Sequence, residues 1–267
     1  MLKLQRFVAV SVLMLTAAVL SGCGDKELAY REQSVYEIYS QAVVHLENGR
    51  FEQAALFFDE VERQHPYSVW ATKAKLMSAY SYYHDGKYDD AVSRLDRFIQ
   101  VHPGNRDIAY AYYLKSLSYY EQIADVRRDQ EYTVKALDAL QDVVTRFPAT
   151  PYGRDARLKL DLTRDHLAGK EMMVGRFYVT NRHYLAAINR FKNVVNTYST
   201  TSHVPEALFR LTECFTALGL KEEAQKSAAV LGYNFPQDQW YRDAFSLVGG
   251  DAKVILQDQA AAAPAQP

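Results

Sequence analysis

The side chains that could carry out chemistry are scattered along this chain rather than grouped. It contains seven histidines, and only at Asp165-His166 does an acidic residue directly precede one. Neighbouring residues on a helix point in different directions, so this pair does not predict a catalytic relay. No phosphate-binding glycine loop, paired-histidine zinc motif or nucleophile elbow occurs in the sequence. We therefore expect no enzymatic activity, no cofactor and no metal site.

The first of the two cysteines follows a segment with the features of a targeting signal. Lys3 and Arg6 precede an apolar run from Phe7 to Leu20, which ends in Leu20-Ser21-Gly22-Cys23. A charged start, a short apolar segment and small residues before the cleavage site predict a secretory signal peptide over residues 1–22. The tetrad resembles the lipobox of bacterial lipoproteins, which implies cleavage before Cys23 and attachment of lipid to it. An ordinary signal peptide with an incidental cysteine is the alternative.

Lipidation of Cys23 would determine where the protein resides. Each buried methylene contributes about 0.8 kcal/mol, so several acyl chains would act as a lasting membrane anchor. Gly24 rather than aspartate follows the cysteine, and resemblance to the usual sorting rule implies the outer membrane, on its periplasmic side. Residues 23–33 would form the lipidated tether, and the Ala/Pro/Gln-rich residues 250–267 are predicted to be a disordered tail.

The second cysteine and the overall charge argue against a disulfide-stabilised protein and against a nucleic-acid-binding protein. With Cys23 lipidated, Cys214 would be the only thiol, so no disulfide framework is expected. Cys214 lies in the apolar-patterned stretch LFRLTECFTALG and is interpreted as a buried small hydrophobe, with a reactive thiol as the alternative. The net charge of −1 would become −3 once the two basic residues of the signal peptide are removed. This balance predicts no binding to nucleic acid.

A repeated pattern organises the rest of the chain. Each copy has an alanine, apolar residues four and seven positions later, and a stop residue twelve positions later. The pairs of alanine and stop residue are Ala54 and Pro66, Ala91 and Pro103, Ala136 and Pro148, Ala187 and Ser199, and Ala224 and Pro236. In three copies a glycine lies five positions before the alanine: Gly49, Gly86 and Gly219. Positions i, i+4 and i+7 share one helix face, so each copy predicts an amphipathic helix entered from a turn.

The spacing of the copies predicts the fold class. Successive alanines are 37, 45, 51 and 37 residues apart, and periods of this size are typical of stacked helix pairs. A single pair cannot bury its apolar stripe alone, so we expect an all-α, right-handed α-solenoid of about five pairs. We expect the paired helices at about 34–47, 50–64, 69–85, 89–101, 105–124, 132–146, 151–178, 184–198, 205–218 and 221–233, with a short cap at 239–248.

The pattern Gly86-x-Tyr88-x-x-Ala91 with Pro103 resembles the tetratricopeptide repeat family. In that family the first helix of each pair lines a concave groove, where aromatic side chains can bind an extended peptide. The resemblance directs five tyrosines toward this groove, although the register of the second unit is ambiguous and packing between helices is the alternative. These residues are Tyr36, Tyr39, Tyr80, Tyr83 and Tyr110.

A closer resemblance, over about Ser34–Tyr233, is to the BamD family of outer-membrane lipoproteins. It rests on Leu95-Asp96-Arg97-Phe98-Ile99, on Arg146-Phe147-Pro148-x-x-x-Tyr152 and on Ala187-Ile188-Asn189-Arg190. The resemblance implies a non-enzymatic subunit of the β-barrel assembly machinery. Its amino-terminal repeats, residues 34–147, would receive segments of unfolded outer-membrane proteins, and its carboxy-terminal repeats, residues 148–249, would bind BamA among the other subunits. Arg190 falls where that family's BamA-contacting arginine does.

Several alternatives remain open at the level of sequence. A tetratricopeptide lipoprotein could serve another envelope process, such as the coordination of peptidoglycan enzymes or polymer export, and a hydrolase with an unrecognised site is a third class. For Arg190 the alternative is a surface arginine without a partner. The charged interruption Asp125 to Glu131, DVRRDQE, is assigned no function.

Overall fold

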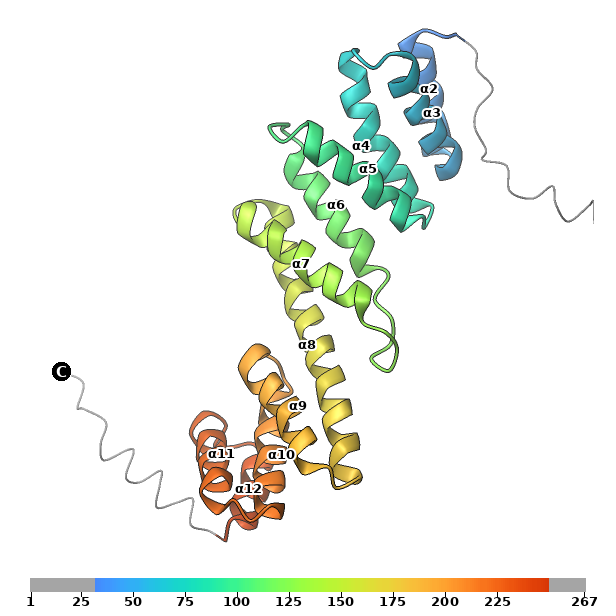
Figure 1. The fold of residues 1–267 in the computed structure, drawn as a ribbon. Coiled ribbons are helices and arrows are strands. Elements are labelled where there is room, and N and C mark those ends of the chain that lie inside the picture. The colour runs from blue at the N-terminus through green and yellow to red at the C-terminus, as the bar shows by residue number, and fades with distance from the viewer. Residues whose placement is uncertain (1–31, 250–267) are drawn as a thin grey trace, which may run out of the picture. The chain divides into compact units, whose positions relative to one another are not determined.

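The computed structural model describes residues 32–249, and all regular structure within that range is helical (Figure 1). This confirms the all-α fold class. The expected signal peptide, most of the tether and the expected tail lie outside the described residues. The chain divides into two compact units, one ending at Lys87 and one beginning at Tyr88. The boundary expected between the two functional halves, at residues 147 and 148, therefore falls inside the second unit.

The described part of the first unit contains three helices, α2 (Val35–Glu47), α3 (Phe51–Gln64) and α4 (Val69–His84). The helix α2 begins at a capping box, in which the Ser34 hydroxyl accepts from the Glu37 amide and the Glu37 carboxylate accepts from the Ser34 amide. This arrangement satisfies two backbone donors that a helix start leaves free. The core of the unit consists of fully buried side chains from all three helices: Ile38, Ala42, Ala54, Phe58, Val61 and Ala74.

The second unit contains the remaining helices of the described chain. They are α5 (Tyr88–Val101), α6 (Ile108–Tyr120), α7 (Glu131–Arg146), α8 (Pro151–Thr180), α9 (Tyr184–Thr197), α10 (Val204–Ala217), α11 (Lys221–Asn234) and α12 (Gln239–Leu247). Sequential helices from α5 to α12 pack on one another. The helix α8 is 30 residues long and serves two neighbours. Its Leu160 belongs to a core shared with α7, and its Met172 belongs to a core shared with α9 and α10.

The alanine pattern read from the sequence marks the core of both units. All five alanines are buried, and so are all the residues four and seven positions after them. The helices that carry the pattern each end two residues before the stop position, and α9 does so although it has Ser199 in place of proline. Proline is therefore not needed to end the helix there, because the same backbone turn forms without it.

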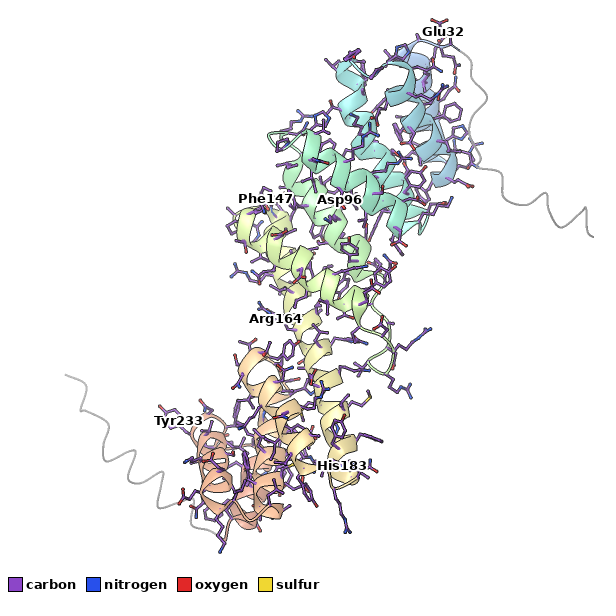
Figure 2. All side chains as sticks on the ribbon, viewed as in Figure 1. Glu32, Asp96, Phe147, Arg164, His183 and Tyr233 are labelled. Carbon is purple, nitrogen blue, oxygen red and sulfur yellow. The ribbon has the colours of Figure 1, made fainter. Side chains whose placement is uncertain are left out.

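The turns that lead into four of these helices share one backbone geometry. Gly49, Gly86 and Gly219 have φ angles of 69°, 76° and 75°, and Arg182 has a φ of 60° at the equivalent position before α9. In each turn this residue and the next one donate their amides to carbonyls three and five positions back; at Arg182 and His183 these bonds measure 2.9 and 2.8 Å. His183, labelled in Figure 2, lies directly after the turn. The turn before α9 therefore has the backbone geometry of the glycine turns, with Arg182 in place of the glycine.

One predicted helix start is wrong. The helix α6 begins at Ile108 rather than near Asn105. The Asn105 side chain accepts a hydrogen bond of 2.8 Å from the amide of Asp107, which forms a turn before the helix instead of a cap on it. Asparagine favours both roles, so its presence alone did not distinguish them.

We predict that Arg182→Gly raises the free energy of unfolding by up to about 1 kcal/mol, because a non-glycine residue at positive φ is strained. Urea unfolding monitored by circular dichroism measures the change. Gly86→Ala is the matched control: a Cβ there would meet no atom within 4 Å, so only backbone strain acts, and stability should fall by a similar amount. A loss of stability in Arg182→Gly would contradict the interpretation.

Candidate functional site

An apolar cleft lies on the first unit. It has a volume of about 360 Å³ and is lined by side chains from one face of α2 and by Trp70 at the start of α4. Two of the predicted tyrosines, Tyr36 and Tyr39, belong to it, together with Val43 and Val44. Exposed apolar surface of this kind is suited to binding apolar side chains of another chain.

The two cleft tyrosines differ in how much surface they offer. Tyr36 is 71% exposed. Tyr39 is half-buried, with its ring 5.4 Å from that of Phe58 in the core and 4.8 Å from that of Trp70. Tyr39 thus joins the cleft to the core.

Tyr80 and Tyr83 lie elsewhere on the first unit and surround His84. The ring centroids are 4.3 and 5.3 Å from that of His84, and Phe51 approaches it from α3 at 5.2 Å. Partial burial lowers the pKa of His84. Ten residues separate Trp70 from Tyr80, about 15 Å along the helix axis. These two tyrosines therefore form a separate aromatic cluster and do not line the cleft.

Tyr110 belongs to the second unit. Its ring lies 5.5 Å from that of Tyr152 on α8, and Tyr113 stacks on the same ring at 5.3 Å. Tyr110 is half-buried in this packing. The five predicted tyrosines therefore occupy three different environments within the described residues.

Arg190 lies on the surface of α9 and has a partner within the chain. Its Nη1 atom is 3.3 Å from both carboxylate oxygens of Glu171 on α8, and its side chain is 45% exposed. Burial, and secondarily the charge of Glu171, raise the pKa of the nearby Tyr198 hydroxyl. An exposed ion pair of this kind contributes roughly 0–1 kcal/mol to stability. Arg190 is therefore paired within the chain and stays accessible to another molecule, and its contact with a partner protein stays a prediction.

Asp165 is engaged with the start of α10 rather than with its neighbour His166. Its carboxylate accepts from the amide and hydroxyl of Ser202 at 3.1 and 2.8 Å, and it lies 3.6 Å from Nε2 of His203. These contacts connect α8 to the segment that enters α10. That Asp165 and His166 form no relay stays a prediction.

Cys214 is fully buried in the core of the second unit. Burial, together with the charge of Glu213, raises the pKa of its thiol to about 12. The thiol is thus held in its neutral, unreactive form, which confirms that Cys214 is a buried small hydrophobe. Within residues 32–249, no three histidine, cysteine or acidic side chains are grouped to hold a metal ion. None of the described helices is long and apolar enough to span a membrane.

Two contacts at the start of the described chain were not foreseen from the sequence. Nε2 of His65 lies 2.8 Å from the carbonyl oxygen of Gln33, and the Gln64 side chain accepts a 3.0 Å hydrogen bond from the Gln33 amide. The end of α3 thereby holds the last residues of the expected tether. The sequence does not predict these contacts, because no local pattern links residues 32 positions apart.

Comparison with known proteins places the chain in a family. The YfiO model, described as outer membrane lipoprotein, matches residues 31–231. The chain belongs to this family. A YfiO relative from Caulobacter vibrioides is 51% identical over 239 residues, covering 88% of this chain and 78% of the relative. One from Rickettsia prowazekii is 46% identical, covering 89% of this chain and 95% of the relative.

Both relatives are named outer membrane protein assembly factor BamD, which confirms the resemblance to the BamD family. The names describe an assembly factor and agree with the expectation of a non-enzymatic protein. The solved TPR2AB domain of yeast Sti1 is 13% identical with a TM-score of 0.42, covering 85% of this chain and 86% of that chain. A likeness this weak carries no argument about function.

Proposed function

We propose that this chain is a non-enzymatic lipoprotein subunit of the β-barrel assembly machinery, which binds BamA and segments of unfolded outer-membrane proteins and promotes their folding and insertion. The observation that carries the proposal is the similarity, over 88% of the chain, to a protein named outer membrane protein assembly factor BamD. The role in outer-membrane protein assembly follows from family membership, and the separate binding surfaces are inferred from the side chains below.

The amino-terminal repeats are proposed to receive the unfolded protein, and the apolar cleft supports this role. A strand of an outer-membrane barrel presents apolar side chains that have no partner before the barrel closes. Tyr36, Val44 and Trp70 expose apolar surface in one cleft, and aromatic side chains bind such residues with little loss of conformational entropy. Tyr80, Tyr83 and Tyr110 are already packed against other rings, so we assign the main contact to the cleft.

The carboxy-terminal repeats are proposed to bind BamA through Arg190. This residue matches the BamA-contacting arginine of the BamD family, and its guanidinium is exposed at the surface of α9. An acidic group on the partner could take the place of Glu171 and form a bidentate pair with the guanidinium. The exchange costs little stability within the chain, because the ion pair with Glu171 is exposed.

The membrane attachment is proposed to run through Cys23. Lipid on this residue would anchor the protein to the outer membrane, and residues 23–33 would connect the anchor to α2. The hydrogen bonds of Gln64 and His65 to Gln33 support this arrangement, since they give the tether a defined point of entry on the first unit.

Binding of unfolded clients predicts the effect of a charge in the cleft. Val44→Asp should weaken binding of a fluorescent peptide taken from an outer-membrane barrel strand about tenfold or more, because it places a charge among apolar side chains. Fluorescence anisotropy measures the affinity. Val101→Asp is the matched control, because Val101 on the second unit is 54% exposed and Val44 is 51% exposed. Equal affinities of the two variants would contradict a client site in the cleft.

Lipid anchoring predicts that Cys23→Ala yields a folded protein that leaves the membrane. The acyl chains that provide the membrane affinity can no longer be attached. Fractionation of envelopes with detection of the protein gives the result, and Cys214→Ala should stay in the membrane fraction. Continued recovery of Cys23→Ala with the outer membrane would show that another attachment suffices.

Contact with BamA predicts that Arg190→Glu reduces co-purification of BamA from solubilised envelopes at least about tenfold, since a rim attraction becomes a repulsion. Arg157→Glu, a charge reversal on the exposed face of α8, is the control for net charge. Unchanged recovery of BamA at high salt would contradict the assignment. Recovery of peptidoglycan enzymes instead of BamA would favour the other envelope function.

A further inference from the structure

The charged interruption between α6 and α7 has a fixed place against the middle of α8. The ammonium group of Lys170 donates to the backbone carbonyls of Arg127 and Arg128 at 3.4 and 3.3 Å. Gly169 precedes Lys170, and a Cβ on this glycine would lie 3.8 Å from the Val126 side chain. A Cβ there would thus be in ordinary contact with the loop, and its tighter neighbour would be Nε2 of His203, at 3.2 Å.

Hydrogen bonds within the loop maintain its shape. The Asp125 carboxylate accepts from the amide and from Nε of Arg127 at 2.9 and 3.0 Å. The side-chain amide of Gln130 donates to the carbonyls of Asp125 and Arg128 at 3.1 and 3.0 Å. These bonds fix the backbone and leave the guanidinium groups of Arg127 and Arg128 exposed to solvent.

Between this loop and α8 lies a hollow of about 490 Å³. Loop residues 127–130 form one wall, and Lys170 and Glu171 form the facing wall. The apolar part of the lining comes from Val134, Leu167 and Tyr198. The hollow could therefore accept an apolar side chain whose neighbours contact charged groups at the rim.

This hollow adjoins Arg190. Glu171, which lines it, is the residue that holds the Arg190 guanidinium at 3.3 Å. Burial raises the pKa of the Tyr198 hydroxyl, and the negative charge of Glu171 raises it further, in agreement with the closeness of these two side chains in the lining. A partner segment that reached Arg190 would thus meet Glu171, which also lines the hollow beside the loop.

The lining of the hollow contains three cations, Arg127, Arg128 and Lys170, and two carboxylates, Asp129 and Glu171, and this excess of positive charge favours an acidic occupant. Arg127 is paired with Asp125, and Arg190 with Glu171. Arg128 and Lys170 have no carboxylate partner within residues 32–249. A carboxylate entering here would meet these two cations and could also take the place of Glu171 at Arg190. Complementary charge of this kind raises the association rate and determines the orientation of the partner.

We propose that loop residues 127–130, the α8 residues Lys170 and Glu171, and Arg190 form one docking socket. Its occupant is a partner segment that carries a carboxylate next to an apolar side chain. This inference rests on the proposed function, in which the segment belongs to BamA. The loop then helps to determine which partner segment can bind, in addition to the contact that Arg190 makes.

Arg128→Glu tests the socket, because Arg128 has no ion pair in the described chain and its reversal breaks none. The probe is the purified periplasmic region of BamA from the same organism, with the affinity measured by calorimetry on the full mature chain. We expect Arg128→Glu to weaken binding about tenfold, with an unchanged melting temperature. Arg157→Glu, 13 residues before Lys170 and about 20 Å away along α8, should change binding less than about twofold.

A double variant determines whether the loop and Arg190 act on the same segment. If they share one occupant, the effects of Arg128→Glu and Arg190→Glu should combine to less than the sum of the single effects. Loss of binding in Arg190→Glu but not in Arg128→Glu would overturn the socket and leave the proposed function intact. Unchanged binding in both single variants would overturn both. Fully additive effects would overturn the shared occupant.

Discussion

The structure depends on the burial of small alanine side chains where neighbouring helices meet. Each alanine of the repeat is buried, and the absence of a longer side chain lets the backbones approach, so that the aromatic and aliphatic residues one and two turns later can fill the core. Gly175 on α8 follows the same principle, because a Cβ there would overlap the ring of the fully buried Phe191 on α9.

Such packing leaves part of the helix surface available for binding. In the first unit the free face of α2 and the start of α4 form the apolar cleft around Tyr36 and Trp70. In the second unit the long helix α8 contributes to two cores. Between the residues of these cores, Lys170 on α8 binds the charged loop, next to the Arg190–Glu171 pair. The two surfaces differ in chemistry, one apolar and one charged. This difference is consistent with two different kinds of partner.

The repeated and local features could be predicted from the sequence, and the contacts between distant residues could not. Buried alanines, glycine turns and the Ser34 capping box each depend on residues within a few positions of one another. The Arg182 turn, the partner of Arg190 and the docking of the loop by Lys170 depend on tertiary packing. The tyrosines show both cases. The resemblance to tetratricopeptide repeats predicts an aromatic surface, but only the structure separates Tyr36 from Tyr80 and Tyr110, since helix register alone does not say which neighbour covers a ring.

We propose that this one chain presents two surfaces to two classes of polypeptide. Photo-crosslinking in living cells tests this directly, with a photoreactive amino acid placed at position 44 or at position 190. Position 44 should capture newly made outer-membrane barrel proteins, and position 190 should capture BamA. Capture of BamA at position 44 with no barrel proteins, or of peptidoglycan enzymes at both positions, would contradict the account.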